Sequence, residues 1–221
     1  MKPWIAIIVL LAALAPAAPC LEPTAGIRAG AGGSILFGSW VDGLRGELEV
    51  LGAATVTERG YVSWRVSGWI DIPLREYLSL RVEPTVGPVG GALLAADGYD
   101  MLVGVTAIEI ALPVLAAAHV RMPVGEIVLG AGVFVGGAIS VREIRNDGTV
   151  RTEGALTNAY ACVGVAGGAG YAFPAGPGAI TIDLRALGSL FSIASPQLDG
   201  MLNTLSVELT VGWALRPRGV E

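Results

Sequence analysis

The sequence predicts an all-β protein, an eight-stranded antiparallel up-and-down transmembrane β-barrel, from three observations. Of the 221 residues, 53% are hydrophobic, only 15% are charged and 32 are glycine, a composition that is unusual for a soluble domain of this length. Apolar and polar residues alternate along most of the chain, which is the period of a strand with two different faces. Short and long connections between the alternating segments follow one another in strict order, as in barrels of outer membranes.

The first residues, 1–17, are typical of a cleaved secretory signal peptide. Lys2 supplies the positive end, an apolar run follows, and residues 15–17 (Ala-Pro-Ala) form a small-x-small cleavage site. The run of about 12 apolar residues is shorter than the roughly 20 that a spanning helix needs, so we expect cleavage and no anchor. Residues 18–26 are then predicted as a short periplasmic segment and 27–216 as the barrel domain.

Eight segments show the alternation, and each is predicted as one strand. In the second, "YVSWRVSGWIDI", one face holds Val62, Trp64, Val66, Ile70 and Ile72, while the other holds Ser63, Arg65, Ser67 and Asp71. The third opens with "LSLRVEP", in which the leucines oppose serine, arginine and glutamate. The predicted strands are 27–41, 61–73, 77–92, 100–120, 125–141, 157–173, 178–192 and 202–215.

The fourth segment contains "TAIEIALPVLAAAHV", which is apolar enough for a membrane helix but has Glu109 and Pro113 in its middle. As a strand, it places Ile108 and Ile110 on the lipid face and Glu109, Ala111 and Pro113 on the lumen face. Proline has no N–H, and a closed barrel has no edge strand to accommodate it. We therefore expect a bulge or a lost ladder bond at Pro113, near the periplasmic half.

The last two segments, "GAITIDLRALG" and "LSVELTVGWAL", alternate most regularly. Ile182 and Leu184 oppose Asp183 and Arg185 in the first of them. After the leader, no segment combines a helix cap with an apolar stripe of 3.6-residue period. The sequence therefore predicts no helix in the barrel domain.

The connections "PLREY", "RMPVG" and "PAGPG" are tight and rich in Pro and Gly, and they fall at the same end as the two termini. The other four are longer: "DGLRGELEVLGAATVTERG", "LLAADGY", "REIRNDGTVRTEGAL" and "IASPQLDGML". Short periplasmic turns and long outer loops define an outer-membrane barrel with both termini in the periplasm. A secreted soluble β-sandwich is the alternative, in which apolar faces would meet each other and charges would coat the outside.

Three stretches resemble the porin-like outer-membrane β-barrel family, small eight-stranded barrels of diderm bacteria. They are "TAIEIALPVLAAAHV…GEIVLGAGVFVGG", "NAYACVGVAGGAGYAFPAGPGAITIDLRALGSL" and "NTLSVELTVGWAL". The resemblance implies an integral outer-membrane barrel and lends no catalytic residues. In the family strand a proline follows the Glu-Ile pair directly, whereas here Ala111 stands there and Pro113 comes two residues later. The chain also continues past Trp213 where many such proteins end on an aromatic residue.

Charged residues gather on the faces that point into the predicted barrel. An eight-stranded barrel is only wide enough inside for side chains to fill it, and a buried charge without a partner is costly. We therefore expect a compensated ion-pair network with a structural role, or alternatively a narrow pore. The residues are Arg65, Asp71, Arg81, Glu83, Glu109, Asp183, Arg185 and Glu208.

No catalytic, cofactor or metal site is expected. His119, the single histidine, falls at the periplasmic end of its strand, so a serine–histidine–carboxylate triad at the outer rim is not predicted; we expect His119 at the rim near the lipid headgroups. Asn146-Asp147-Gly148 lacks the spaced acids of a calcium loop. Cys162 and His119 lie on different strands without paired zinc ligands.

Charge and cysteine content narrow the range of partners. The net charge is −5, or −5 − 1 = −6 once the leader removes Lys2, the only lysine. The outer loops also hold more acids than arginines. Both observations argue against nucleic acid and other polyanions as partners.

Cys20, at the expected mature terminus, is lipidated, free or disulfide-bonded to Cys162. The Val and Thr content of loop 42–60 suggests strands extending above the membrane, whose edge can bind a partner by strand addition.

These observations predict a monomeric, non-enzymatic protein integral to the outer membrane, with a structural or surface-interaction role and a lumen filled by side chains. Its predicted partners are outer-membrane lipid and, through the long loops, an extracellular protein. A narrow pore or transport component and a secreted β-sandwich are the alternatives.

Overall fold

The computed structural model describes residues 22–96, 101–146, 150–156, 161–193 and 201–215. The predicted signal peptide and Cys20 lie outside these ranges. The elements within them are β1 Thr24–Phe37, α2 Ser39–Val50, β2 Thr55–Arg75, β3 Leu78–Val82, β4 Thr85–Ala96, β5 Met101–Met122, β6 Gly125–Asn146, β7 Arg151–Leu156, β8 Ala161–Ala175, β9 Gly178–Ile193 and β10 Asn203–Leu215. The first strand thus begins three residues before the predicted barrel domain.

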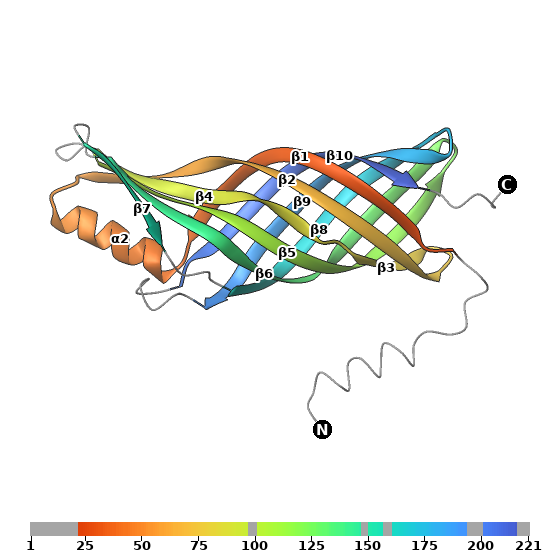
Figure 1. Cartoon of the computed structure of the whole chain (residues 1–221), viewed down its shortest axis with the longest axis horizontal. Coiled ribbons are helices and arrows are strands. Elements are labelled where there is room, and N and C mark those ends of the chain that lie inside the picture. The colour runs from red at the N-terminus through yellow and green to blue at the C-terminus, as the bar shows by residue number, and fades with distance from the viewer. Residues whose placement is uncertain (1–21, 97–100, 147–149, 157–160, 194–200, 216–221) are drawn as a thin grey trace, which may run out of the picture.

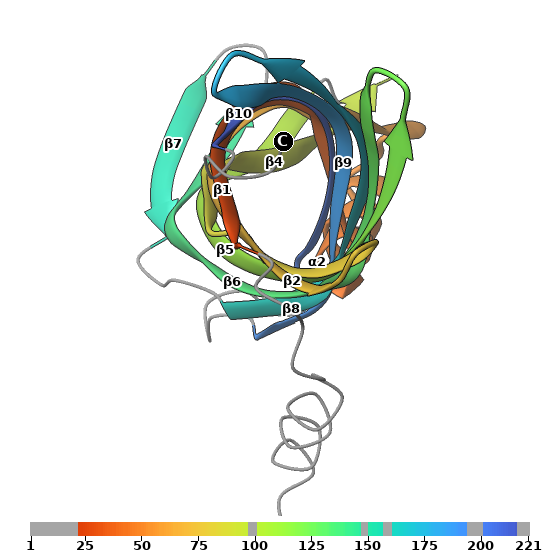
Figure 2. The same cartoon turned by 90° about the vertical axis from the view of Figure 1, so that its right-hand side faces the viewer.

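The strands form one closed antiparallel ring, because β10 pairs with β1, from Ala25 opposite Leu215 to Phe37 opposite Asn203. Two ring positions are each filled by two consecutive strands. β3 and β4 both lie between β2 and β5, and β7 and β8 both pair with β6. The ring therefore has eight strands, as predicted. Figure 2 looks at the barrel from one end and shows the closed ring. Closure pairs the backbone groups that lipid cannot satisfy.

The two faces of the ring differ in polarity as the alternation predicts. On β2, Trp64 is 51% exposed outside the ring while its neighbour Arg65 is 5% exposed inside it. On β9, Leu184 is 56% exposed and Asp183 only 7%. In a soluble sandwich the apolar faces would meet each other. The outward apolar belt therefore excludes the sandwich and identifies a transmembrane β-barrel.

Three two-residue turns, 76–77, 123–124 and 176–177, join strands at the end where β1 begins and β10 ends. The longer connections lie at the other end, so the predicted order of connections is confirmed. In outer-membrane barrels the short turns are periplasmic, which defines a periplasmic end and an outer end. Figure 1 shows the start of β1 and the end of β10 on the right, at the periplasmic end, and α2 on the left, at the outer end.

Three strands reach further at the outer end than predicted: β2 begins at residue 55 instead of 61, β4 ends at 96 instead of 92, and β6 ends at 146 instead of 141. β5 and β6 have 22 residues each, about twice the 9–11 that cross a bilayer. Along β2 the outward side chains change from Val62 to Arg59 and Thr57, so the apolar belt ends below this extension. We call the paired residues 55–60, 91–96, 101–107, 140–146 and 151–156 the outer flap. The strand extension expected within 42–60 is thereby confirmed for 55–60.

Helix α2 contradicts the prediction that the barrel domain has no helix, and it shortens the predicted strand 27–41. Val41, Leu44 and Leu48 form a buried stripe at helical spacing, and they pack with apolar residues inside the outer flap. Gly52 ends the helix with a φ of +99°, a conformation that favours glycine. The stripe is short and glycines interrupt it, which explains why the sequence pattern does not reveal it.

Pro113 lies beside the break between β3 and β4. Its carbonyl accepts a hydrogen bond from the Glu83 N–H at 3.0 Å. In an antiparallel strand the N–H and C=O of one residue point to the same side, so the N–H that Pro113 lacks falls at this break, which agrees with the expected loss of a ladder bond. The ladder with β6 passes Pro113 without a shift, and its irregularity lies at Ile108 and Glu109 instead.

A second irregularity loosens β2 from β4, where the register shifts between Gly60 and Val66. Ser34, on the inner face of β1, reaches across this gap. Its hydroxyl donates to the Gly90 carbonyl and accepts from the Gly90 N–H, both at 2.9 Å. The serine thus satisfies two buried backbone groups of β4 that the shifted strand leaves without a ladder partner.

Candidate functional site: the filled lumen and its helix-capped mouth

All eight charged residues predicted for the lumen are buried in it, and none is more than 7% exposed. Seven of them come from five strands whose inner faces meet inside the ring, and Glu83 lies in the break between β3 and β4. The side chains do not form one chain of contacts but gather in three clusters along the barrel axis. The residues are Arg65, Asp71, Arg81, Glu83, Glu109, Asp183, Arg185 and Glu208.

The first cluster lies nearest the periplasmic end. Arg81 holds Asp71 with two hydrogen bonds, Nε to Oδ1 and Nη2 to Oδ2, both at 2.7 Å. This bidentate geometry is the strongest that an arginine and a carboxylate adopt. Trp69, 3% exposed, lies beside the pair, with the Arg81 guanidinium carbon 5.5 Å from its ring centroid.

The second cluster contains Arg28, which the sequence analysis missed. Arg28 Nη2 lies 2.6 Å from Glu83 Oε2, and Arg28 Nη1 lies 3.1 Å from Asp183 Oδ2. Arg185 binds the same Glu83 oxygen at 2.7 Å, so this carboxylate joins two arginines. The Arg28 guanidinium also lies 4.6 Å from the Trp69 ring centroid, a cation–π distance. Successive side chains of a strand point to opposite faces. The apolar Ile27 was therefore the signal in the sequence that would have placed its neighbour Arg28 inside.

The third cluster lies toward the middle of the barrel and contains one arginine between two acids. Arg65 Nη1 lies 3.3 Å from Glu109 Oε1, and Arg65 Nε lies 3.0 Å from Glu208 Oε1. Ser206 accepts a further hydrogen bond from Arg65 at 3.4 Å. Across the three clusters, four arginines face five carboxylates, so the formal charge of the lumen is 4 − 5 = −1.

Two small cavities, each with about 10 Å³ of room for the centre of a water molecule, lie between the clusters. Arg65, Glu83 and Glu208 line the larger one, and Arg81, Asp183 and Arg185 line the smaller. Polar walls of this kind suit ordered water. Neither cavity has the dimensions or uniform charge of an ion-conducting channel.

Above the charged clusters, toward the outer end, the lumen is apolar. Val89, Leu93, Val103 and Val105 line it, each 3% exposed or less, and the buried stripe of α2 packs against them. Arg45 of the helix forms an ion pair with Glu58 of the outer flap. The start of α2 is tied to the segment before β10, because Met201 N–H donates to the Ser39 hydroxyl at 2.9 Å and Trp40 N–H donates to the Met201 carbonyl at 3.2 Å.

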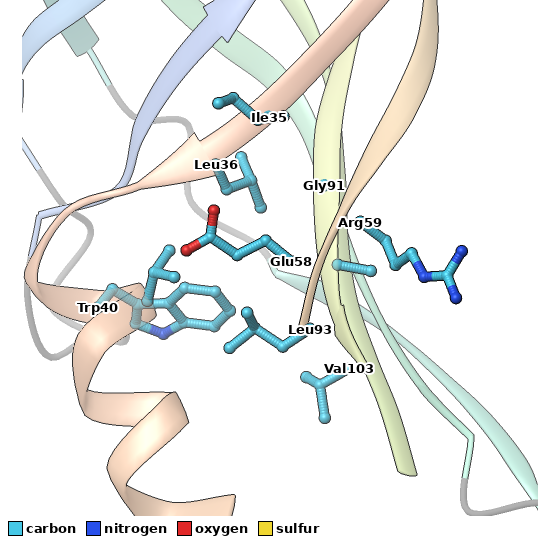
Figure 3. Close-up of a pocket in the computed structure, with 10 residues that line it drawn as sticks. Ile35, Leu36, Trp40, Glu58, Arg59, Gly91, Leu93 and Val103 are labelled. Atoms are coloured by element: carbon cyan, nitrogen blue, oxygen red, sulfur yellow. The ribbon is translucent and has the colours of Figure 1, made fainter. Parts of the chain in front are cut away.

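One pocket, with about 10 Å³ of room for the centre of a water molecule, opens beside this cap, between the outer end of β1 and the outer flap. Trp40, Leu36 and Leu93 give it apolar walls, as Figure 3 shows. Glu58 points toward Trp40, whereas Arg59 points to the opposite side of the strand. The pocket is shallow and mostly apolar, and it holds no pair of groups that could act as acid and base.

His119 lies inside the periplasmic mouth rather than near the headgroups, which corrects the prediction for this residue. Its Nε2 is 2.8 Å from the Ser79 hydroxyl, and its Nδ1 is 2.9 Å from Glu126 Oε1. The Ser79 hydroxyl also donates to Asp71 Oδ1 at 3.4 Å. The sequence could not show this contact because the three residues stand on three different strands, whose register alone brings them together.

The described part of the chain contains no group of three or more His, Cys, Asp or Glu side chains arranged to hold a metal ion. Cys162 is buried there as a free thiol, with its sulfur 4.0 Å from Glu109 Oε2. Among these residues, no helix is both long and apolar enough to cross a membrane.

No protein-family model matches the chain, and no curated protein matches it. Among solved structures, Ail, the attachment invasion locus protein of Yersinia pestis, was solved in complex with the heparin analogue sucrose octasulfate; it is 12% identical, the match covers 88% of this chain and 100% of Ail, and the TM-score is 0.42. The outer membrane protein OprG from Pseudomonas aeruginosa is 8% identical over 89% of this chain and 97% of its own, with a TM-score of 0.47. The outer membrane protease OmpT from Escherichia coli is 8% identical over 87% and 96%, with a TM-score of 0.44. Likenesses of this size support no argument about activity or partners, and the barrel is established by its own closed hydrogen-bonded ring.

Proposed function

We propose that this outer-membrane β-barrel is a closed, non-conducting protein with a structural role, and that it presents α2 and the outer flap as an interaction surface outside the cell. One observation supports the proposal above all, which is that side chains fill the lumen along its length. Ion-pair clusters fill its periplasmic and middle parts, and an apolar core under α2 fills its outer end.

The ion-pair clusters argue against the alternative of a narrow pore. Each arginine is held by at least one carboxylate at 3.3 Å or less, and releasing one member would leave its partner buried and unpaired, at a cost of several kcal/mol. An ion passing through would have to break such pairs at three successive levels. The structural role of the eight predicted residues, together with Arg28, is therefore to close and stiffen the barrel.

The residues at the outer end limit the kinds of ligand that this surface can bind. α2 exposes Asp42, Glu47 and Glu49 and has Arg45 as its one basic residue. Such a surface repels polyanions, so a ligand like the sulfated sugar in the Ail structure does not suit it. The outer flap stands above the apolar belt, where its strands can meet an extracellular protein. The pairing of Ser, His and acid that a hydrolase would need at this end is absent from the described residues, so we propose no catalysis at the outer surface.

Site-directed labelling tests the orientation on which this role depends. Glu49→Cys places a thiol on the exposed face of α2, and Glu76→Cys places one in a periplasmic turn, where Glu76 is 72% exposed. A maleimide that cannot cross membranes should label Glu49→Cys on intact cells and should label Glu76→Cys only after the outer membrane is opened. Equal labelling of both on intact cells, or labelling of Glu76→Cys alone, would contradict the proposed surface.

A further inference from the structure

Three side chains at the periplasmic mouth have the geometry of a nucleophile, a base and an acid that orients the base. Ser79, His119 and Glu126 stand on the neighbouring strands β3, β5 and β6, and all three point into the lumen. The Ser79 oxygen lies 2.8 Å from His119 Nε2, and Glu126 Oε1 lies 2.9 Å from His119 Nδ1. Both distances are within the range of a hydrogen-bonded triad.

The two histidine nitrogens have different partners, which decides their roles. The Glu126 carboxylate can only accept a hydrogen bond, so it favours the His119 tautomer that carries its proton on Nδ1. Nε2 then has a lone pair directed at the Ser79 hydroxyl and can accept its proton. This is the division of labour that defines serine triads on unrelated folds.

The histidine and the glutamate are partly exposed at the mouth, and the serine is the deepest of the three. The side chains of His119 and Glu126 are 16% and 24% exposed at the mouth, and Ser79, 3% exposed, lies just inside them. The Ser79 hydroxyl also donates to Asp71 Oδ1 at 3.4 Å, so Asp71 competes with His119 Nε2, which is closer at 2.8 Å, for the single hydroxyl hydrogen, and its carboxylate would oppose negative charge on the Ser79 oxygen. Arg81 offsets this effect, since it binds both oxygens of Asp71.

We propose that Ser79, His119 and Glu126 form a serine nucleophile site at the periplasmic mouth that accepts acyl groups from carboxylic esters. Ser79 Oγ attacks the ester carbonyl carbon while its proton passes to His119 Nε2. The ester C–O bond then breaks, the leaving alcohol takes that proton, and Ser79 is left acylated. Water attacks the acyl carbon, gives a proton to His119, and releases the carboxylic acid as Ser79 recovers its hydroxyl hydrogen.

The position of Ser79 within paired strands predicts slow turnover of the ester. Ser79 is paired in register with Ala117 on one side and with Pro73, which has no N–H to donate, on the other, so the ladders beside Ser79 provide no ready oxyanion hole. Missing one oxyanion donor costs about 10²–10³ in kcat. Covalent capture of the serine is therefore a sharper readout than product formation.

The test uses the full-length protein, folded in detergent and in phospholipid vesicles, with a fluorophosphonate probe that reacts with activated serines. We expect labelling at Ser79, identified by peptide mass spectrometry, and none in Ser79→Ala. His119→Gln should lower the labelling rate at least about 100-fold, within the range for general-base catalysis. Ser67→Ala, which removes another buried lumen serine that no histidine contacts, should label like the unaltered protein.

Glu126→Gln separates a positioning role from a packing role. Glutamine keeps the size of the side chain, so a residue that only packs would leave the labelling rate unchanged. If Glu126 orients His119, the rate should fall at least about tenfold while the heat-modifiable gel mobility of the folded barrel stays the same.

Two acyl donors identify the source of the ester. A short water-soluble p-nitrophenyl ester and the phospholipid of the vesicles are each incubated with the protein, and the mass of the Ser79 peptide is measured. Acylation by either supports the proposal and names the class of ester. Folded protein that the fluorophosphonate does not label at Ser79 overturns the site, and labelling without acylation by either ester overturns the substrate class.

Discussion

Arg28 should be the most sensitive charged residue of the lumen, and Arg28→Met tests this. Methionine preserves much of the volume but leaves Asp183 without the arginine that lies 3.1 Å from it, while Glu83 keeps Arg185 at 2.7 Å. Breaking one buried pair costs about 3–5 kcal/mol, and losing the cation–π contact with Trp69 adds about 0.5–2 kcal/mol. We therefore expect the free energy of unfolding to fall by at least about 3 kcal/mol.

Urea unfolding of the barrel in phospholipid vesicles measures this change. Tryptophan emission and heat-modifiable gel mobility report the folded fraction, and the transition midpoint reports stability if the slope is unchanged. Arg121→Met is the matched control, because Arg121 also pairs with an acid, Glu76, but both side chains are 72% exposed. An exposed pair contributes about 0–1 kcal/mol.

A double variant tests why Arg28→Met loses stability. If the cost in Arg28→Met is the stranded carboxylate of Asp183, then adding Asp183→Leu should recover most of the lost stability, since replacing a buried pair by apolar residues is often neutral. The reasoning is refuted if Arg28→Met destabilises no more than Arg121→Met, or if the two lumen substitutions are simply additive.

Three further outcomes follow from the packing. Ser34→Ala leaves the N–H and C=O of Gly90 unpaired and should lower the free energy of unfolding by about 1–3 kcal/mol, measured by the same urea titration. Leu48→Ala, at 1% exposure, should loosen α2 by about 2–5 kcal/mol and speed proteolysis within the helix, whereas Val50→Ala, at 89% exposure, should not. Gly43→Ala lies in the same helix with nothing within 4 Å of the added methyl group and should slow that proteolysis, because alanine favours a helix over glycine by about 0.5–1 kcal/mol.

The faces of the strands could be predicted from sequence because their period is local. Glu109 and Arg185 each stand between apolar neighbours, and in a strand of period two this alone places them inside. Arg28 was missed because Ile27 is the only large apolar residue beside it, and the Ala and Gly residues that surround the pair have small side chains that do not mark a face. The structure places it inside through pairing with β10 and β2.

Features that depend on contacts between distant segments could not be predicted. The buried stripe of α2 has three residues, and they become a hydrophobic face only where Leu93 and Val103 of the outer flap lie opposite. Ser79 and His119 are 40 residues apart, and a register change of one residue would turn one of them to lipid. The turns and the closed ring determine that register, and neither is visible in the spacing of the residues.

Single-channel recording in planar bilayers tests the central claim, that the lumen is closed. The full-length protein is inserted from detergent, and its insertion is verified by heat-modifiable mobility and by protease protection of the strands. Because ion pairs fill the lumen at three levels beneath an apolar core, we predict no discrete current steps. Reproducible, ion-selective steps from the inserted protein would contradict the closed barrel and favour the narrow pore.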